Sequence, residues 1–79
     1  MSPTLFRERG YRFFFFSREE TRMHVHVAHA EGEAKYWLEP EIALAENYRL
    51  TAQSLREVEV LVRTHEKEIR DAWHRHFPG

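Results

Sequence analysis

Two histidines, His24 and His26, stand two positions apart in a stretch where polar and apolar residues alternate. If that stretch is a β-strand, both imidazoles point to the same side, with Cβ atoms roughly 6.5 to 7 Å apart. Imidazoles are common metal ligands and titrate close to neutral pH. The pair therefore indicates a metal site, metal-free acid–base catalysis, or a polar strand face that serves folding and docking.

A metal site would need further ligands, because two imidazoles do not complete a coordination sphere. Glu39 is expected on the same strand face, and His74 or His76 would come from the C-terminal segment. Two histidines and one carboxylate form a known catalytic zinc set. A divalent metal such as zinc, held by His24, His26 and Glu39, is therefore the alternative to a chain without a cofactor.

Without a metal, the same histidines support a small nuclease. His24 and His26 would act as general acid and base, with Lys35 holding a phosphate. Trp37 or Tyr36 would stack a base. The arginines that would follow the nucleic-acid backbone are Arg7, Arg9, Arg12, Arg18 and Arg22. The plain alternative is a polar strand face whose imidazoles are hydrogen bonded to carboxylates.

Strands are the elements predicted to hold these side chains. Residues 11–17 are rich in aromatic residues, residues 23–28 alternate polar with apolar, and residues 34–38 follow a tight turn at Glu31 and Gly32. The predicted pairs are Ala28 with Lys35, His26 with Trp37, and His24 with Glu39. This pairing separates two sets of side chains: His24, His26, Lys35, Trp37 and Glu39 on one face, and Val25, Val27, Tyr36 and Leu38 on the other.

A long helix is predicted at the C-terminus. Thr51 is a candidate N-cap, and an apolar stripe at helical spacing runs from Leu55 to His76. About 25 helical residues would span roughly 38 Å, and without an internal Gly or Pro we expect one continuous or gently bent helix. Residues 41–50 are predicted to be extended, since Ile42 and Leu44 alternate as in a strand, although their composition also suits one or two helical turns. The fold class is α+β: an antiparallel meander of three or four strands followed by one long C-terminal helix, in one domain over residues 1–79.

The phenylalanine run at residues 13–16 predicts a sheet with two apolar faces. Phe13 and Phe15 point to one side of a strand, and Phe14 and Phe16 to the other. One helix covers a single face, so the other face requires a homodimer or a small cognate partner protein. The residues predicted to bind there are Arg12, Phe14, Phe16 and Trp37. The residues predicted to anchor the helix end are Trp73, His74, His76 and Phe77.

Composition limits the classes of function. The chain has 79 residues, no cysteine, 42% hydrophobic residues and a net charge of -1. These values predict a folded cytoplasmic protein without disulfides or a thiolate metal cage. Its apolar runs are far shorter than the roughly 20 residues that cross a membrane. The chain also lacks the basic excess of a duplex-binding protein, so net charge does not support a nucleic-acid partner.

Four segments, in this order, resemble the domain-of-unknown-function family 4160: GYRFFFFS at residues 10–17, HVHV at 24–27, EAKYWLEP at 33–40 and WHRHF at 73–77. Members of that family are small prokaryotic proteins without an established activity, and some are encoded beside a second small protein in toxin–antitoxin-like pairs. The resemblance implies a protein-interaction module that is one component of such a pair. The residues themselves keep a second hypothesis open, a His-dependent nuclease or metal-assisted hydrolase at His24 and His26.

Overall fold

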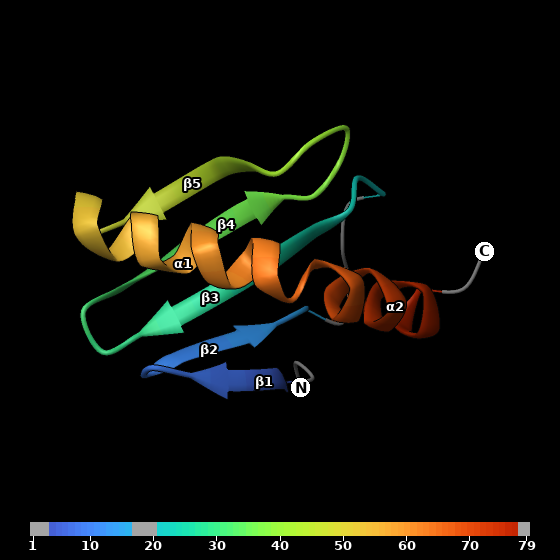
Figure 1. The fold of residues 1–79 in the computed structure, drawn as a ribbon, viewed down its shortest axis with the longest axis horizontal. Helices are drawn as coiled ribbons and strands as arrows, with labels where there is room; N and C mark the ends of the chain where they lie inside the picture. The colour runs from blue at the N-terminus through green and yellow to red at the C-terminus, as the bar shows by residue number, and fades with distance from the viewer. Residues whose placement is uncertain (1–3, 17–20, 78–79) are drawn as a thin grey trace.

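The computed structural model describes residues 4–16 and 21–77. They form a five-stranded antiparallel sheet in the order β1-β2-β3-β4-β5, followed by two helices (Figure 1). The elements are β1 (Thr4–Glu8), β2 (Tyr11–Phe14), β3 (His24–His29), β4 (Gly32–Trp37), β5 (Ala43–Tyr48), α1 (Ala52–Thr64) and α2 (Glu66–His76). The predicted α+β meander is confirmed, whereas the predicted numbers of strands and helices are wrong.

The strand missing from the prediction is β1, which forms a hairpin with β2. The turn residues Arg9 and Gly10 both have positive φ, 55° and 82°. Two such residues give a turn whose twist matches an antiparallel hairpin, and asparagine or glycine usually occupies the first position. Because an arginine stands there instead, the turn signal was weak and the opening segment was not recognised as a strand.

The β3–β4 turn begins one residue earlier than predicted. His24 therefore lies opposite Trp37, and His26 lies opposite Lys35. The predicted pairing was wrong by two positions, but an even shift leaves every paired side chain on its predicted face. The imidazoles of His24 and His26 accordingly lie on one side of the sheet, with ring centroids 5.0 Å apart.

The C-terminal helical region begins where the sequence predicted, since the Thr51 hydroxyl accepts a hydrogen bond of 3.0 Å from a first-turn amide. It is not continuous, because His65, with φ -103° and ψ 20°, separates α1 from α2. A straight helix of about 38 Å would exceed the 35 Å length of the molecule. The break instead lets Ile69 and Trp73 join the buried core.

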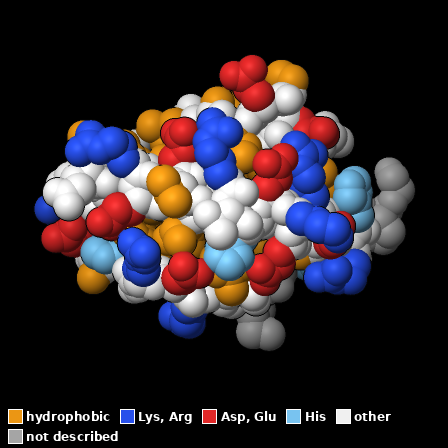
Figure 2. Space-filling view, in the orientation of Figure 1, with side chains coloured by type: hydrophobic (Ala, Val, Ile, Leu, Met, Phe, Trp, Pro, Cys, Tyr) orange, Lys and Arg blue, Asp and Glu red, His pale blue; other side chains and the backbone are white. Residues whose placement is uncertain are grey.

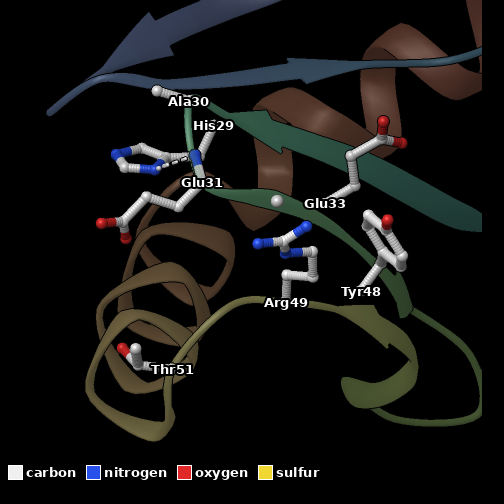
Figure 3. A pocket seen from close by; sticks show the side chains of 8 residues that line it. His29, Ala30, Glu31, Glu33, Tyr48, Arg49 and Thr51 are labelled. Carbon is white, nitrogen blue, oxygen red and sulfur yellow. Dashed lines mark hydrogen bonds between the residues drawn. The ribbon is translucent and has the colours of Figure 1, made fainter.

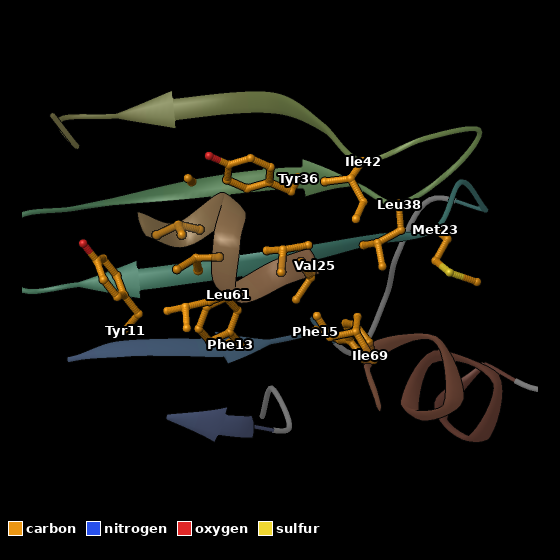
Figure 4. Close-up of a cluster of buried hydrophobic side chains, with 14 of the residues drawn as sticks. Tyr11, Phe13, Phe15, Met23, Val25, Tyr36, Leu38, Ile42, Leu61 and Ile69 are labelled. Carbon is orange, nitrogen blue, oxygen red and sulfur yellow. The ribbon is translucent and has the colours of Figure 1, made fainter. Parts of the chain in front are cut away.

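The hydrophobic core lies between the helices and one face of the sheet (Figure 4). Phe13 and Phe15 point into this core and are fully buried. Phe14 and Phe16 lie on the opposite side, where both rings contact His26. The predicted division of the phenylalanine run between two faces is therefore confirmed.

Three further sequence predictions concern residues 11–17, Arg18 and residues 41–50. The strand predicted over residues 11–17 ends at Phe14, and residue 17 lies outside the described residues. Arg18, predicted to follow a nucleic-acid backbone, also lies outside them. Residues 41–50, predicted to be extended, contain β5.

The outer side of the helices carries Lys and Arg side chains interspersed with Asp and Glu (Figure 2). Ion pairs at helical spacing join Glu59 to Arg63 at 3.2 Å and Glu66 to Arg70 at 2.8 Å. Such mixed charge is typical of a solvated helix face. No helix among the described residues is long and apolar enough to cross a membrane.

Candidate functional site

The side of the sheet opposite the helices, which we call the second face, collects most of the residues predicted to do chemistry. Its charged and aromatic residues are Arg7, Arg12, Phe14, Phe16, Arg22, His24, His26, Glu33, Lys35, Trp37, Glu46 and Tyr48. Strand alternation places them there, because residues paired across neighbouring strands point to the same side. α1 packs on the opposite side of the sheet (Figure 1), and α2 contacts the second face through Trp73, which reaches His24.

His24 is the most enclosed residue of the second face, with none of its surface exposed. Its Nδ1 lies 2.6 Å from the carbonyl oxygen of Arg22. A carbonyl only accepts, so the His24 Nδ1–H donates this hydrogen bond. Trp37 and Trp73 contact the ring edge-to-face, with centroids at 5.6 and 5.3 Å. The His24 imidazole is thus buried and is held in place by this hydrogen bond and by the two tryptophan rings, and it does not face solvent.

His26 lies nearer the surface, among aromatic rings. Phe16 and Phe14 pack on its imidazole with centroid distances of 4.3 and 5.5 Å, and His24 contacts it at 5.0 Å. These rings restrict the orientation of the imidazole. His26 is half-buried, so part of its side chain lies at the surface although its Nε2 is buried.

Cations lie over the aromatic rings of the second face. The Arg12 guanidinium is 4.4 Å from the Phe14 ring centroid, and Arg12 Nε donates to the Thr4 hydroxyl at 2.8 Å. The Trp37 ring is approached by the Arg22 guanidinium at 4.1 Å and the Lys35 ammonium at 4.5 Å. All four residues predicted to bind at this face, Arg12, Phe14, Phe16 and Trp37, lie on it together.

A cleft of about 460 Å³ opens on the second face above β3, β4 and β5. The polar side chains among its lining residues are His26, Glu33, Lys35, Glu46, Asn47 and Tyr48. His26, Lys35 and Glu46 form one row, since each is paired with the next across neighbouring strands. Sequence reasoning did not select Glu46. The alternation of residues 43–48, combined with the β4–β5 pairing, is the signal that would have placed it there.

The structure does not bring Glu39 to the histidines. Its carboxylate accepts a hydrogen bond of 3.1 Å from Arg70, and the same guanidinium donates to the Leu38 carbonyl at 2.8 Å. Glu39 follows the end of β4, so it is not held to the strand alternation that the prediction assumed. Across residues 4–16 and 21–77, no three His, Cys, Asp or Glu side chains lie close enough together to hold a metal ion.

The C-terminal histidines also stay apart from the strand pair. His74 and His76 are exposed, and the His76 ring contacts Phe15 at 6.0 Å. Trp73 is the residue of this segment that reaches His24. Phe77 packs on Trp73 at 4.4 Å. The segment therefore anchors the helix end, as predicted.

Tyr36, predicted as an alternative to Trp37 for stacking a base, points into the core. Its hydroxyl donates to the Leu55 carbonyl at 3.0 Å. Burial, followed by the negative charge of Glu59, raises the pKa of Tyr36 to about 12. Of the two aromatic residues, Trp37 is the one that lies on the second face.

A second hollow lies at the far end of the β3–β4 hairpin, with a volume of about 610 Å³ (Figure 3). It is bordered by the β3–β4 turn and by the segment that joins β5 to α1. His29 Nδ1 accepts a hydrogen bond of 3.2 Å from the Glu31 amide, and its ring packs on Tyr11 at 4.7 Å. His29 therefore supports the hairpin turn. This hollow has a larger volume than the cleft but contains none of the residues that the sequence predicted to bind or to catalyse.

In a comparison with protein-family models, residues 10–74 match the family described as Domain of unknown function (DUF4160). The matched range includes the His24 and His26 pair and runs from β2 into α2. Neither the curated proteins nor the solved structures give a match. Since the match covers well over half of the chain, this protein belongs to the DUF4160 family.

Proposed function

We propose that this chain is a protein-interaction module, one component of a toxin–antitoxin-like pair, and that it binds its partner through the second face. The observation that carries the proposal is the unequal covering of the sheet. The described helices pack against one side, while aromatic and cationic side chains gather on the other. Aromatic residues and arginine are enriched where proteins meet.

Apolar surface at the second face supports a protein partner. Phe16 is 44% exposed, and Tyr48, at the β5 edge, is 65% exposed. Trp37, at the end of β4, is half-buried on the same face. Exposed aromatic residues that cluster on one side of a small protein are typical of an interaction site.

Charge on the second face indicates what the partner presents. Among the residues that the structure describes, the cations are Arg7, Arg12, Arg22 and Lys35, and the carboxylates are Glu33 and Glu46. Cations are therefore in excess here, although the whole chain has a net charge of -1. We expect a partner surface that combines carboxylates with apolar side chains, because complementary charge speeds association and fixes orientation.

The aromatic rings under these cations favour binding in a second way. Arg12 over Phe14 and Arg22 over Trp37 are held at 4.4 and 4.1 Å. A guanidinium that is already restricted by a ring loses less side-chain entropy when it binds a carboxylate. The second face is thus partly organised before the partner arrives.

The test is co-purification of this chain with the product of its neighbouring gene, followed by titration calorimetry. Arg12→Glu should weaken the complex at least tenfold, because it places a carboxylate against the acidic partner. Arg56→Glu makes the same charge change on the exposed side of α1 and should leave the affinity within twofold.

Two results would overturn the proposal. One is equal weakening by both reversals, which would place the partner elsewhere or show a general charge effect. The other is a stable dimer of the chain alone, detected by light scattering and dissociated by Arg12→Glu, which would make a second copy the occupant of the face.

A further inference from the structure

We infer that His26, Lys35 and Glu46 form an acid–base site that cleaves single-stranded RNA without a metal ion. The inference is independent of partner binding. It rests on one row of side chains and the cleft that they line, not on the overall character of the second face.

The row gives the three groups an order in space. His26 on β3 is paired with Lys35 on β4, and Lys35 is paired with Glu46 on β5. Neighbouring strands lie about 4.8 Å apart, so the outer two residues start roughly 10 Å from each other, on opposite sides of the lysine. A phosphate above the Lys35 amine would have a proton acceptor on one side and a proton donor on the other. In-line displacement at phosphorus requires this arrangement.

Lys35 is fixed in the middle of the row. Lys35 is only 8% exposed, and its ammonium lies 4.5 Å from the Trp37 ring centroid. The β4–β5 pairing is irregular between Lys35 and Tyr36. Such bulges change the direction of side chains and are frequent beside active sites. An amine held in this way can stabilise the charge that develops on phosphate oxygens.

The second imidazole of the original pair does not take part in the chemistry. His24 is fully buried, so it cannot touch a substrate. His26 lines the cleft, with its ring held by Phe14 and Phe16. Glu46 is exposed at the other end of the row. The base that sequence analysis assigned to a histidine is therefore assigned to this carboxylate.

The reaction balances without an added reactant. The Glu46 carboxylate takes the proton of a ribose 2′-hydroxyl, and the 2′-oxygen forms a bond to phosphorus. The bond between phosphorus and the 5′-oxygen breaks, and protonated His26 gives its Nδ1 proton to that leaving oxygen, because its Nε2 is buried. The products are a 2′,3′-cyclic phosphate and a free 5′-hydroxyl. Glu46 and His26 then exchange protons with water and return to their starting states.

RNA is the substrate class because this reaction uses the 2′-hydroxyl as its nucleophile, and DNA lacks that group. Phe16 and Tyr48, 44% and 65% exposed, offer rings on which neighbouring bases could stack. Arg12, next to Phe14 on the same face, is placed to contact the backbone.

The test uses the full chain and a single-stranded RNA oligonucleotide labelled at its 5′ end, with a DNA oligonucleotide of the same sequence as reference. We expect cleavage of the RNA alone, unchanged by EDTA, with a cyclic phosphate identified by mass spectrometry. Glu46→Gln and His26→Gln should each lower the rate at least about 100-fold. Glu41→Gln, an exposed carboxylate outside the row, is the matched control and should stay within twofold.

Several results would overturn the inference: no cleavage of RNA, cleavage of DNA at the same rate, loss of cleavage in EDTA, or full activity in Glu46→Gln. Glu46→Gln, purified in the same way as the unchanged chain, also controls for a contaminating nuclease, because a contaminant would cleave the RNA equally in both preparations. Because Glu46 is exposed, its substitution should not unfold the chain, and circular dichroism checks this point. Partner binding could fail in calorimetry while RNA cleavage persists, so the two proposals fail separately.

Discussion

The two faces of the sheet differ in what they hold although neighbouring residues of the same strands build them. On the core face, Phe13 and Val25 are fully buried against the helices. On the second face, Phe14 and His26 stack on each other, and a guanidinium lies over the Phe14 ring. The comparison teaches that one side of a strand can stabilise the fold while the other side is available for recognition. Successive side chains point to opposite faces of the sheet and so have different neighbours.

The largest expected contrast is between two phenylalanines of the same run. Phe13→Ala removes a fully buried ring from the core and should lower the free energy of unfolding by about 3 to 5 kcal/mol. Phe16→Ala removes a ring that is 44% exposed and should cost at most about 1 kcal/mol. Urea denaturation of both variants measures the difference. Equal losses would show that the second face is as much a part of the core as the first.

A smaller contrast is expected between the two histidines. His24→Ala opens a cavity beside Trp37 and Trp73 and removes the hydrogen bond to the Arg22 carbonyl, so we expect a loss of about 2 to 4 kcal/mol. His26→Ala should cost about 1 kcal/mol, because His26 is half-buried. Thermal unfolding followed by circular dichroism compares them. If His26→Ala proves the more damaging change, His26 is a structural residue and the proposed site loses its acid.

The smallest expected effect is a pH dependence of stability that comes from His65, between α1 and α2. His65 contacts Glu8 at 2.8 Å through Nε2 and Glu68 at 3.0 Å through Nδ1. Burial lowers the pKa of His65, but hydrogen bonds and charge from Glu8 and Glu68 outweigh it and hold that pKa above its usual value. The resulting stability is fully present below the usual pKa of about 6.5 and is lost as pH rises through the raised value.

Because this contact is partly exposed, the change in unfolding free energy should be only a few tenths of a kcal/mol. Urea midpoints at several pH values between about 5 and 8 measure it. His65→Gln should flatten the profile. If the urea midpoint of His65→Gln depends on pH as strongly as that of the unchanged chain, the pH dependence comes from another group.

Alternation along the strands made much of the fold and the site predictable. The division of the phenylalanine run, the common face of His24 and His26, and the position of Arg12 and Trp37 on the second face all follow from a period of two. The error in hairpin register did no harm, because a shift of two residues preserves the faces.

The features that sequence analysis missed depend on single backbone positions or on packing between distant segments. The first hairpin turns at Arg9, a residue type that rarely adopts positive φ. The helix breaks at His65 without a Gly or Pro to mark it. Glu39 leaves the histidine face because Arg70, far along the chain, binds its carboxylate. Glu46 was missed because the prediction did not pair its own segment, residues 41–50, with the strand that contains Lys35.

The most direct test of the account is a nitrogen-15 NMR titration with the neighbouring gene product. The chain has two tryptophans, and they report on different places: Trp37 lies on the second face, and Trp73 is buried at the helix end. We predict that the Trp37 indole signal shifts strongly as the partner is added, while the Trp73 signal moves little. A shift confined to Trp73, or none in either signal at saturating partner, would contradict the claim that the second face is the binding surface.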